Sequence, residues 1–128
     1  MPIDAFFYWP ETAKKNPFTT EFKSGILRFV AGLEKVTDIP MKVTVRFIPA
    51  MLLPNGSDEF AYGHCYYESD PIVIHVAADM NTPVEGIYDT IAHEIVHVEQ
   101  VRDGRAITER GVKVRARNLV KRVLEEIQ

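Results

Sequence analysis

The sequence predicts an α+β fold built as one domain over residues 1–128. Apolar residues alternate with polar ones in short segments, which indicates strands, and recur every three or four residues in longer segments, which indicates helices. Hydrophobic residues make up 46% of the chain, which is enough for one core, and no linker or low-complexity tract divides it. We therefore expect a small mixed β-sheet packed against helices.

The N-terminal part predicts a strand followed by a helix. Residues 3–9 contain four consecutive aromatic residues, which favours a packed strand or extended arm. Asn16-Pro17 is typical of a helix start, and Asp38-Ile39-Pro40 of a helix end. We expect this helix to back the sheet, because apolar residues recur in it at helical spacing: Phe18, Phe22, Ile26, Phe29, Leu33 and Val36.

Three strands are predicted in the middle of the chain. Residues 43–47 alternate between apolar and polar side chains, and a loop rich in turn residues covers 49–59. Residues 60–67 and 72–78 are two further strands, joined by a turn at Ser69-Asp70-Pro71. If the strand over 72–78 ends as an exposed edge beside a cleft, an extended peptide can pair with it as one more strand.

Residues 82–104 predict a largely apolar helix. Thr82-Pro83-Val84-Glu85 combines an N-cap hydroxyl, a proline at the first helical position and a glutamate at the third, which is the pattern of a capping box. Gly104 is the natural stop. The helix must be largely buried, because one stripe of it is apolar throughout: Ile87, Ile91, Ile95 and Val98.

Three polar residues on this helix, His93, Glu94 and His97, form the sequence His-Glu-Ile-Val-His. Four helical residues turn the chain through about 400°, so the two imidazoles project from one face and can hold one metal ion. Zinc accepts nitrogen ligands and, in catalytic sites, keeps one position for water. Glu94 lies about 100° further round the helix, where it can act on that water as general base. The pattern predicts a zinc hydrolase.

A third protein ligand is needed, and two carboxylates are candidates. Asp103 stands six residues after His97, at the position of the last ligand in a metzincin-like motif, but Gln100 replaces the glycine which that motif requires. Glu109 begins a final helix with an apolar stripe, and it lies on the inward face of that helix, three residues before Val112. A carboxylate facing a core needs a partner, and zinc is an adequate one. We favour Glu109, and Asp103 remains the alternative.

The order of these elements resembles the minimal gluzincin fold, a zincin peptidase reduced to a backing helix, a small sheet, an HEXXH helix and a C-terminal helix with the third ligand. Residues 62–100 are also similar to SprT-like metallopeptidases. The resemblance implies zinc-dependent hydrolysis of peptide bonds in a peptide or protein substrate, with Glu94 as the catalytic base. It also implies a tyrosine or histidine that stabilises the oxyanion, for which four residues are eligible: Tyr62, His64, Tyr66 and Tyr67.

Charge and cysteine content suggest where the protein acts. Cys65 is the single cysteine, which fits a reducing compartment, and no secretory segment or long apolar run is present, so we expect a cytoplasmic protein that does not enter membranes. Residues 1–101 carry a net charge of −7 and residues 102–128 carry +4. The basic end can attract nucleic acid through eight residues: Arg102, Arg105, Arg110, Lys113, Arg115, Arg117, Lys121 and Arg122.

Two functions from other classes remain open. The chain can be a zinc-stabilised binding module without turnover, although Glu94 then has no role. It can also be a nucleic-acid-associated factor, with or without peptidase activity, and salt-dependent DNA binding would distinguish that class.

Overall fold

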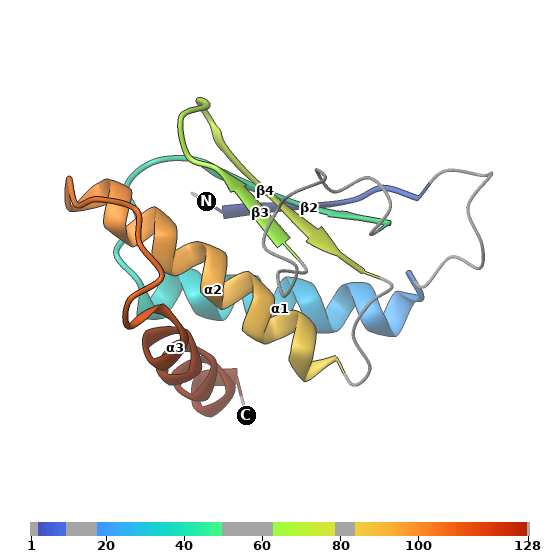
Figure 1. Ribbon diagram of the computed structural model, residues 1–128. Helices are drawn as coiled ribbons and strands as arrows, with labels where there is room; N and C mark the ends of the chain where they lie inside the picture. Colours follow the sequence, from blue (N-terminus) through green and yellow to red (C-terminus); the bar gives the residue numbers. More distant parts are fainter. Residues whose placement is uncertain (1–2, 10–17, 50–62, 79–83, 128) are drawn as a thin grey trace.

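A four-stranded mixed sheet lies over a layer of helices (Figure 1). The computed structural model describes residues 3–9, 18–49, 63–78 and 84–127. Its elements follow the order β1 (Ile3–Phe7), α1 (Thr20–Val36), β2 (Val43–Ile48), β3 (Gly63–Tyr66), β4 (Ile72–Ala77), α2 (Glu85–Arg102) and α3 (Val112–Ile127). The predicted α+β fold is confirmed.

The strands lie in the order β1-β2-β4-β3. β1, β2 and β4 are parallel, whereas β3 runs antiparallel to β4. The expectation that residues 72–78 form an exposed edge is therefore wrong, because β4 lies between β2 and β3. A short turn joins β3 to β4 and makes them an antiparallel pair, so the edge on this side of the sheet is β3.

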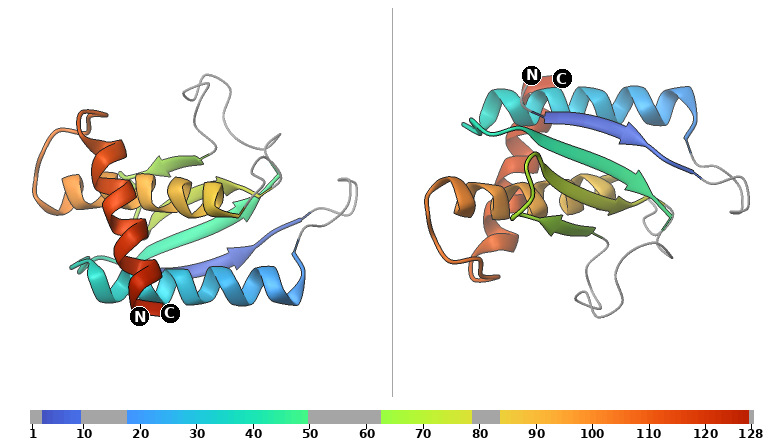
Figure 2. Two further views of the ribbon diagram at one scale, coloured as in Figure 1. Left: turned by 90° about the horizontal axis from the view of Figure 1, so that it is seen from below. Right: turned by 90° about the horizontal axis from the view of Figure 1, so that it is seen from above.

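One face of the sheet packs on the helices. Val45 and Ile74 are fully buried between exposed or half-buried neighbours, and Phe47 is fully buried on the same face as Val45, as the two-residue period predicts. Figure 2 shows α1 and α2 beneath the sheet and α3 across both of them. α3 approaches α1 so closely that a Cβ on Gly32 would lie 2.7 Å from Cγ1 of Val123. None of the described helices is long and apolar enough to cross a membrane.

The start of α1 and the end of α2 follow local capping chemistry, whereas α2 begins at Glu85 and its N-cap residue, Val84, makes no side-chain hydrogen bond, so the expected place of Glu85 as third helical residue is wrong. Helix α1 begins at Thr20, where the hydroxyl of Thr19 accepts a hydrogen bond from the backbone N–H of Phe22 at 3.1 Å. The proposed start at Asn16-Pro17 lies outside the described residues, as does the Thr82-Pro83 part of the capping box expected for α2. Helix α2 ends as predicted, because Gly104 follows it with a left-handed φ of 67°.

Candidate metal centre

Helix α2 carries both histidines of the motif on the same side. Their ring centroids are 5.1 Å apart, as expected for residues four positions apart on a helix. The His93 side chain is 23% exposed and the His97 side chain 7% exposed, so the pair lies at the border of the buried face. Burial lowers the pKa of His93, which favours the neutral ring that binds metals.

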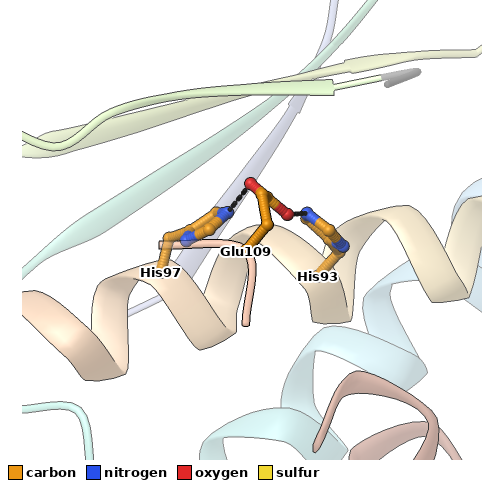
Figure 3. A group of neighbouring side chains, drawn as sticks. All are labelled: His93, His97 and Glu109. Carbon is orange, nitrogen blue, oxygen red and sulfur yellow. Dashed lines mark hydrogen bonds and ion pairs between the residues drawn. The ribbon is translucent and has the colours of Figure 1, made fainter. Parts of the chain in front are cut away.

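Glu109 reaches both histidines. One carboxylate oxygen lies 2.9 Å from Nε2 of His97 and the other 3.0 Å from Nε2 of His93 (Figure 3). Glu109 does not begin α3 as expected, but lies in the loop three residues before it. The reason is Gly111, whose φ of 74° interrupts the helix on its N-terminal side. The side chain reaches the histidines all the same, but it is 63% exposed, so the expectation that it faces the core is wrong.

The donor atoms of His93, His97 and Glu109 all lie within 4.8 Å of one another. Two imidazole nitrogens and one carboxylate oxygen form a donor set known from catalytic zinc sites, in which the fourth position is left for water. Ligands bonded to zinc at 2.0–2.1 Å stand about 3.3 Å apart in a tetrahedron, so small movements of the three side chains would admit the ion. The residues fit a zinc ion in both chemistry and spacing.

Gln100 decides which nitrogen of His97 carries the proton. The Nε2 amide of Gln100 donates to the carbonyl of Thr108 at 3.0 Å, and its Oε1 accepts from the Thr108 N–H at 3.4 Å. This orients the amide so that Oε1, 2.9 Å from Nδ1 of His97, must accept a hydrogen bond from an N–H at that nitrogen. In the neutral ring, the lone pair is then on Nε2 and faces a carboxylate oxygen of Glu109, an arrangement that a cation between the two atoms would stabilise; in the charged ring, Nε2 donates a hydrogen bond to that oxygen.

Glu94 lies beside the donor group, under the edge strand, and its side chain is not one of the three donors. It is only 5% exposed, and burial, the largest cause, raises the pKa of its carboxyl to about 7. The charge of Glu109 raises this pKa further, whereas His97 lowers it. A carboxyl with a pKa near neutrality can both accept and return a proton at physiological pH.

Strand β3 packs closely against α2 at Glu94. A Cβ on Gly63 would lie 3.4 Å from Cγ of Glu94 and 2.9 Å from Cγ2 of Thr90, so only glycine lets the strand approach α2 this closely. Burial, followed by the charge of Glu94, raises the pKa of the Cys65 thiol to about 12. Cys65 therefore stays a neutral, apolar neighbour of the carboxylate.

Comparison with protein-family models, curated proteins and solved structures gives no match. The case for a function therefore depends on the arrangement of side chains at this centre.

The structure does not bring Asp103 to the histidines. Its carboxylate lies 2.8 Å from Nε of Arg102 and 3.3 Å from Nη2 of Arg105, at the exposed end of α2. The hydrogen bond from Arg102 is the largest cause that lowers the Asp103 pKa. Asp103 is thus a partner of arginines, and Glu109 is the carboxylate that stands beside the histidines.

Two of the four oxyanion candidates lie on the wrong face of the sheet. The rings of His64 and Tyr66 contact each other with centroids 4.6 Å apart, on the face opposite Cys65 and α2. Tyr67 is 41% exposed in the turn after β3, and Tyr62 lies outside the described residues. No oxyanion residue is assigned.

Two polar residues of α2, Gln100 and Glu99, have partners that the sequence analysis did not predict. Gln100 lies three residues after His97, and this spacing on a helix could have identified it. Glu99 is buried and accepts two hydrogen bonds from Arg115 of α3, at 3.1 and 2.8 Å. Three of the eight C-terminal basic residues are therefore paired with acids: Arg102, Arg105 and Arg115.

Proposed function

We propose that this protein is a zinc-dependent metallopeptidase of the zincin type. The observation that carries the proposal is that Gln100 orients the His97 ring with Nε2 toward a Glu109 oxygen 2.9 Å away. A divalent cation bound between these two atoms would be held by both of them. The Nε2 of His93 stands equally close to the second oxygen and completes the set.

His93, His97 and Glu109 would hold the ion. When bound, zinc polarises the scissile carbonyl and lowers the pKa of water. Glu94 is placed to accept a proton from the attacking water and to return it to the nitrogen that leaves. Its raised pKa supports this role, because a fully solvated carboxylate would be a weaker base.

The proposed substrate is an extended peptide that pairs with β3. This strand is at the edge of the sheet and passes directly over Glu94, so its outer backbone groups can pair with a peptide. Gly63 brings the paired substrate close to the donor group. The architecture over α1, the sheet, α2 and α3 supports the resemblance to minimal gluzincins, although Glu109 precedes the last helix.

The decisive experiment separates metal binding from turnover. Glu94→Gln keeps the shape of the side chain but cannot accept a proton, so we expect about one zinc per chain and no peptide cleavage. Glu85→Gln, in the exposed first turn of α2, is the matched control and should cleave as the parent does. Metal analysis and a fluorogenic peptide library give the two measurements. Cleavage by Glu94→Gln at the parental rate would refute the mechanism.

The same data address a zinc-stabilised module without turnover. In that case the parent protein binds zinc and gains thermal stability from it, but neither parent nor variant cleaves any peptide. Glu109→Ala should weaken zinc binding under either function, because it removes one of three ligands.

A further inference from the structure

The face of the sheet that points away from the helices carries an unusual row of side chains. Phe6, Arg46, His75 and His64 are successive cross-strand neighbours on β1, β2, β4 and β3. Arg46 is the one permanently charged residue of the row, and the two histidines beside it add ring nitrogens that can hydrogen-bond.

Arg46 has no acidic partner in the described part of the chain. It is exposed and forms none of the ion pairs found there, although arginines elsewhere in the molecule pair with Asp103 or Glu99. None of the acids in the described ranges therefore takes up the donors of its guanidinium. A planar guanidinium matches a carboxylate with two parallel hydrogen bonds.

His75, beside Arg46, has an unused hydrogen-bonding group. Its Nδ1 is buried and has no partner among the described residues. A buried acceptor without a partner is less costly than a buried N–H without one, so the proton belongs on Nε2. The ring then offers one N–H donor next to the guanidinium.

A cavity of about 440 Å³ lies at this place, lined by Phe6, Tyr8, Arg46, Ile48 and His75. Its volume is that of a small-molecule site. Phe6 and Tyr8 are 56% and 53% exposed, which is high for aromatic side chains in a folded chain. The cavity thus combines two available aromatic rings with one available cation.

We propose that this cavity binds an aromatic carboxylate, with Arg46 on the carboxylate and Phe6 and Tyr8 against the ring. The charge decides between anions: Arg46 supplies one permanent positive charge, which balances a carboxylate, whereas a phosphate monoester carries nearly two negative charges. The carboxylate can belong to a free aromatic acid or to the C-terminal residue of a peptide.

This site is separate from the metal centre. Neighbouring residues of a strand point to opposite faces, and Val45, Phe47 and Ile74 point from β2 and β4 into the core above the helices. Arg46 and His75 therefore face away from α2. The proposal does not depend on the proposed peptidase activity.

Binding of N-acetyl-L-phenylalanine to the full chain, followed by two-dimensional amide NMR, tests the proposal. We expect saturable shifts confined to residues around the cavity, with a dissociation constant of about 1 mM or lower. N-acetyl-L-phenylalaninamide, which lacks the charge, and acetate, which lacks the ring, should each bind at least about tenfold more weakly. A peptide that ends in phenylalanine distinguishes the sources: tighter binding than the free acid indicates a peptide C-terminus, and weaker binding indicates a free acid.

Variants locate the interaction. Arg46→Gln should weaken binding of the acid about tenfold and leave zinc binding unchanged, whereas Arg46→Lys, which keeps the charge, should lose less. Arg122→Gln, at an exposed arginine of α3, is the matched control and should bind as the parent does. The proposal is overturned if the acid does not bind, if the amide binds equally well, or if Arg46→Gln binds with the affinity of the parent.

Discussion

Replacing Gln100 by leucine tests the geometry from which zinc binding is inferred. Leucine has a similar volume but has neither the donor nor the acceptor of the amide, so three hydrogen bonds are lost: one to His97 and two to the backbone of Thr108. Gln100 is only 4% exposed, so the His97 N–H is left without a partner in the interior. We expect the zinc-free variant to lose about 1–3 kcal/mol of folding free energy.

The substitution should also weaken zinc binding, in addition to lowering the stability of the zinc-free protein. Without Gln100, the proton of His97 is free to move to Nε2 and block the nitrogen that faces Glu109, while the loop of Glu109 loses its link to α2. Outer partners of metal-binding histidines typically contribute 10–100-fold in affinity, so the dissociation constant for zinc should rise by about that factor. A competition titration against a chromophoric chelator at pH 7.4 measures it directly.

Two further variants separate packing from orientation. Asn118→Leu makes the same kind of change on the exposed face of α3 and should leave zinc affinity unaltered. Gln100→Glu can still accept from His97 but cannot donate to Thr108, so it should retain most of the affinity. Nitrogen-15 NMR of the His97 ring reports the tautomer. If Gln100→Leu binds zinc within about twofold of the parent, Gln100 does not set the tautomer and our reasoning fails.

Three other predictions concern the surroundings of the centre. Gly63→Ala should lower the melting temperature and reduce the free energy of unfolding by about 1–3 kcal/mol, because the new Cβ would lie 2.9 Å from Cγ2 of Thr90. Adding Thr90→Ser, which removes that methyl group, should recover part of the loss. Arg115→Leu should destabilise the fold by about 2–4 kcal/mol in urea unfolding, because buried Glu99 loses both of its hydrogen bonds and keeps only the 3.9 Å contact with Nη1 of Arg102. Glu99→Gln in the same chain should restore part of the stability. Burial lowers the pKa of folded His75 from 6.5, so below about pH 6.5 the unfolded chain takes up a proton that the folded chain does not. The free energy of unfolding should therefore fall with pH in this range, by at most about 1.4 kcal/mol per pH unit. This loss should be absent in His75→Asn.

Periodicity in the sequence predicted what depends on neighbours along the chain. The alternation over 43–47 gave the buried face of β2, and the end of α2 at Gly104 followed from backbone conformation alone. The stripe of α3 did not predict the surroundings of Glu109, which is exposed and precedes the helix, because Gly111 with its φ of 74° ends the helical phase before that residue. That Glu109 stands beside the histidines depends on how its loop packs on α2.

The order of the strands could not be derived in this way. Each strand has one buried face whichever neighbours it takes, so alternation is equally consistent with β4 at the edge or in the middle of the sheet. The choice is made by β2, which pairs with β4 in parallel and leaves β3 outside. That pairing joins segments far apart in the chain, which local patterns do not record.

The contacts around the metal centre also differ in whether the sequence could predict them, because one joins neighbours on α2 and the other joins two helices. Gln100 lies three residues after His97 on the same helix, a spacing at which side chains are neighbours, so a spacing argument could have predicted this contact. Arg115 belongs to another helix, and only the packing of α3 on α2 brings it to Glu99. Because Glu99 and Gln100 are adjacent, the first bonds α2 to α3 while the second bonds α2 to the loop between them. The loop that carries Glu109 is therefore held near Thr108 by Gln100 and, beyond the loop, by the bond between Arg115 and Glu99. Spacing along the sequence could have predicted the contact of Gln100 with His97, but not the pairing of Arg115 with Glu99.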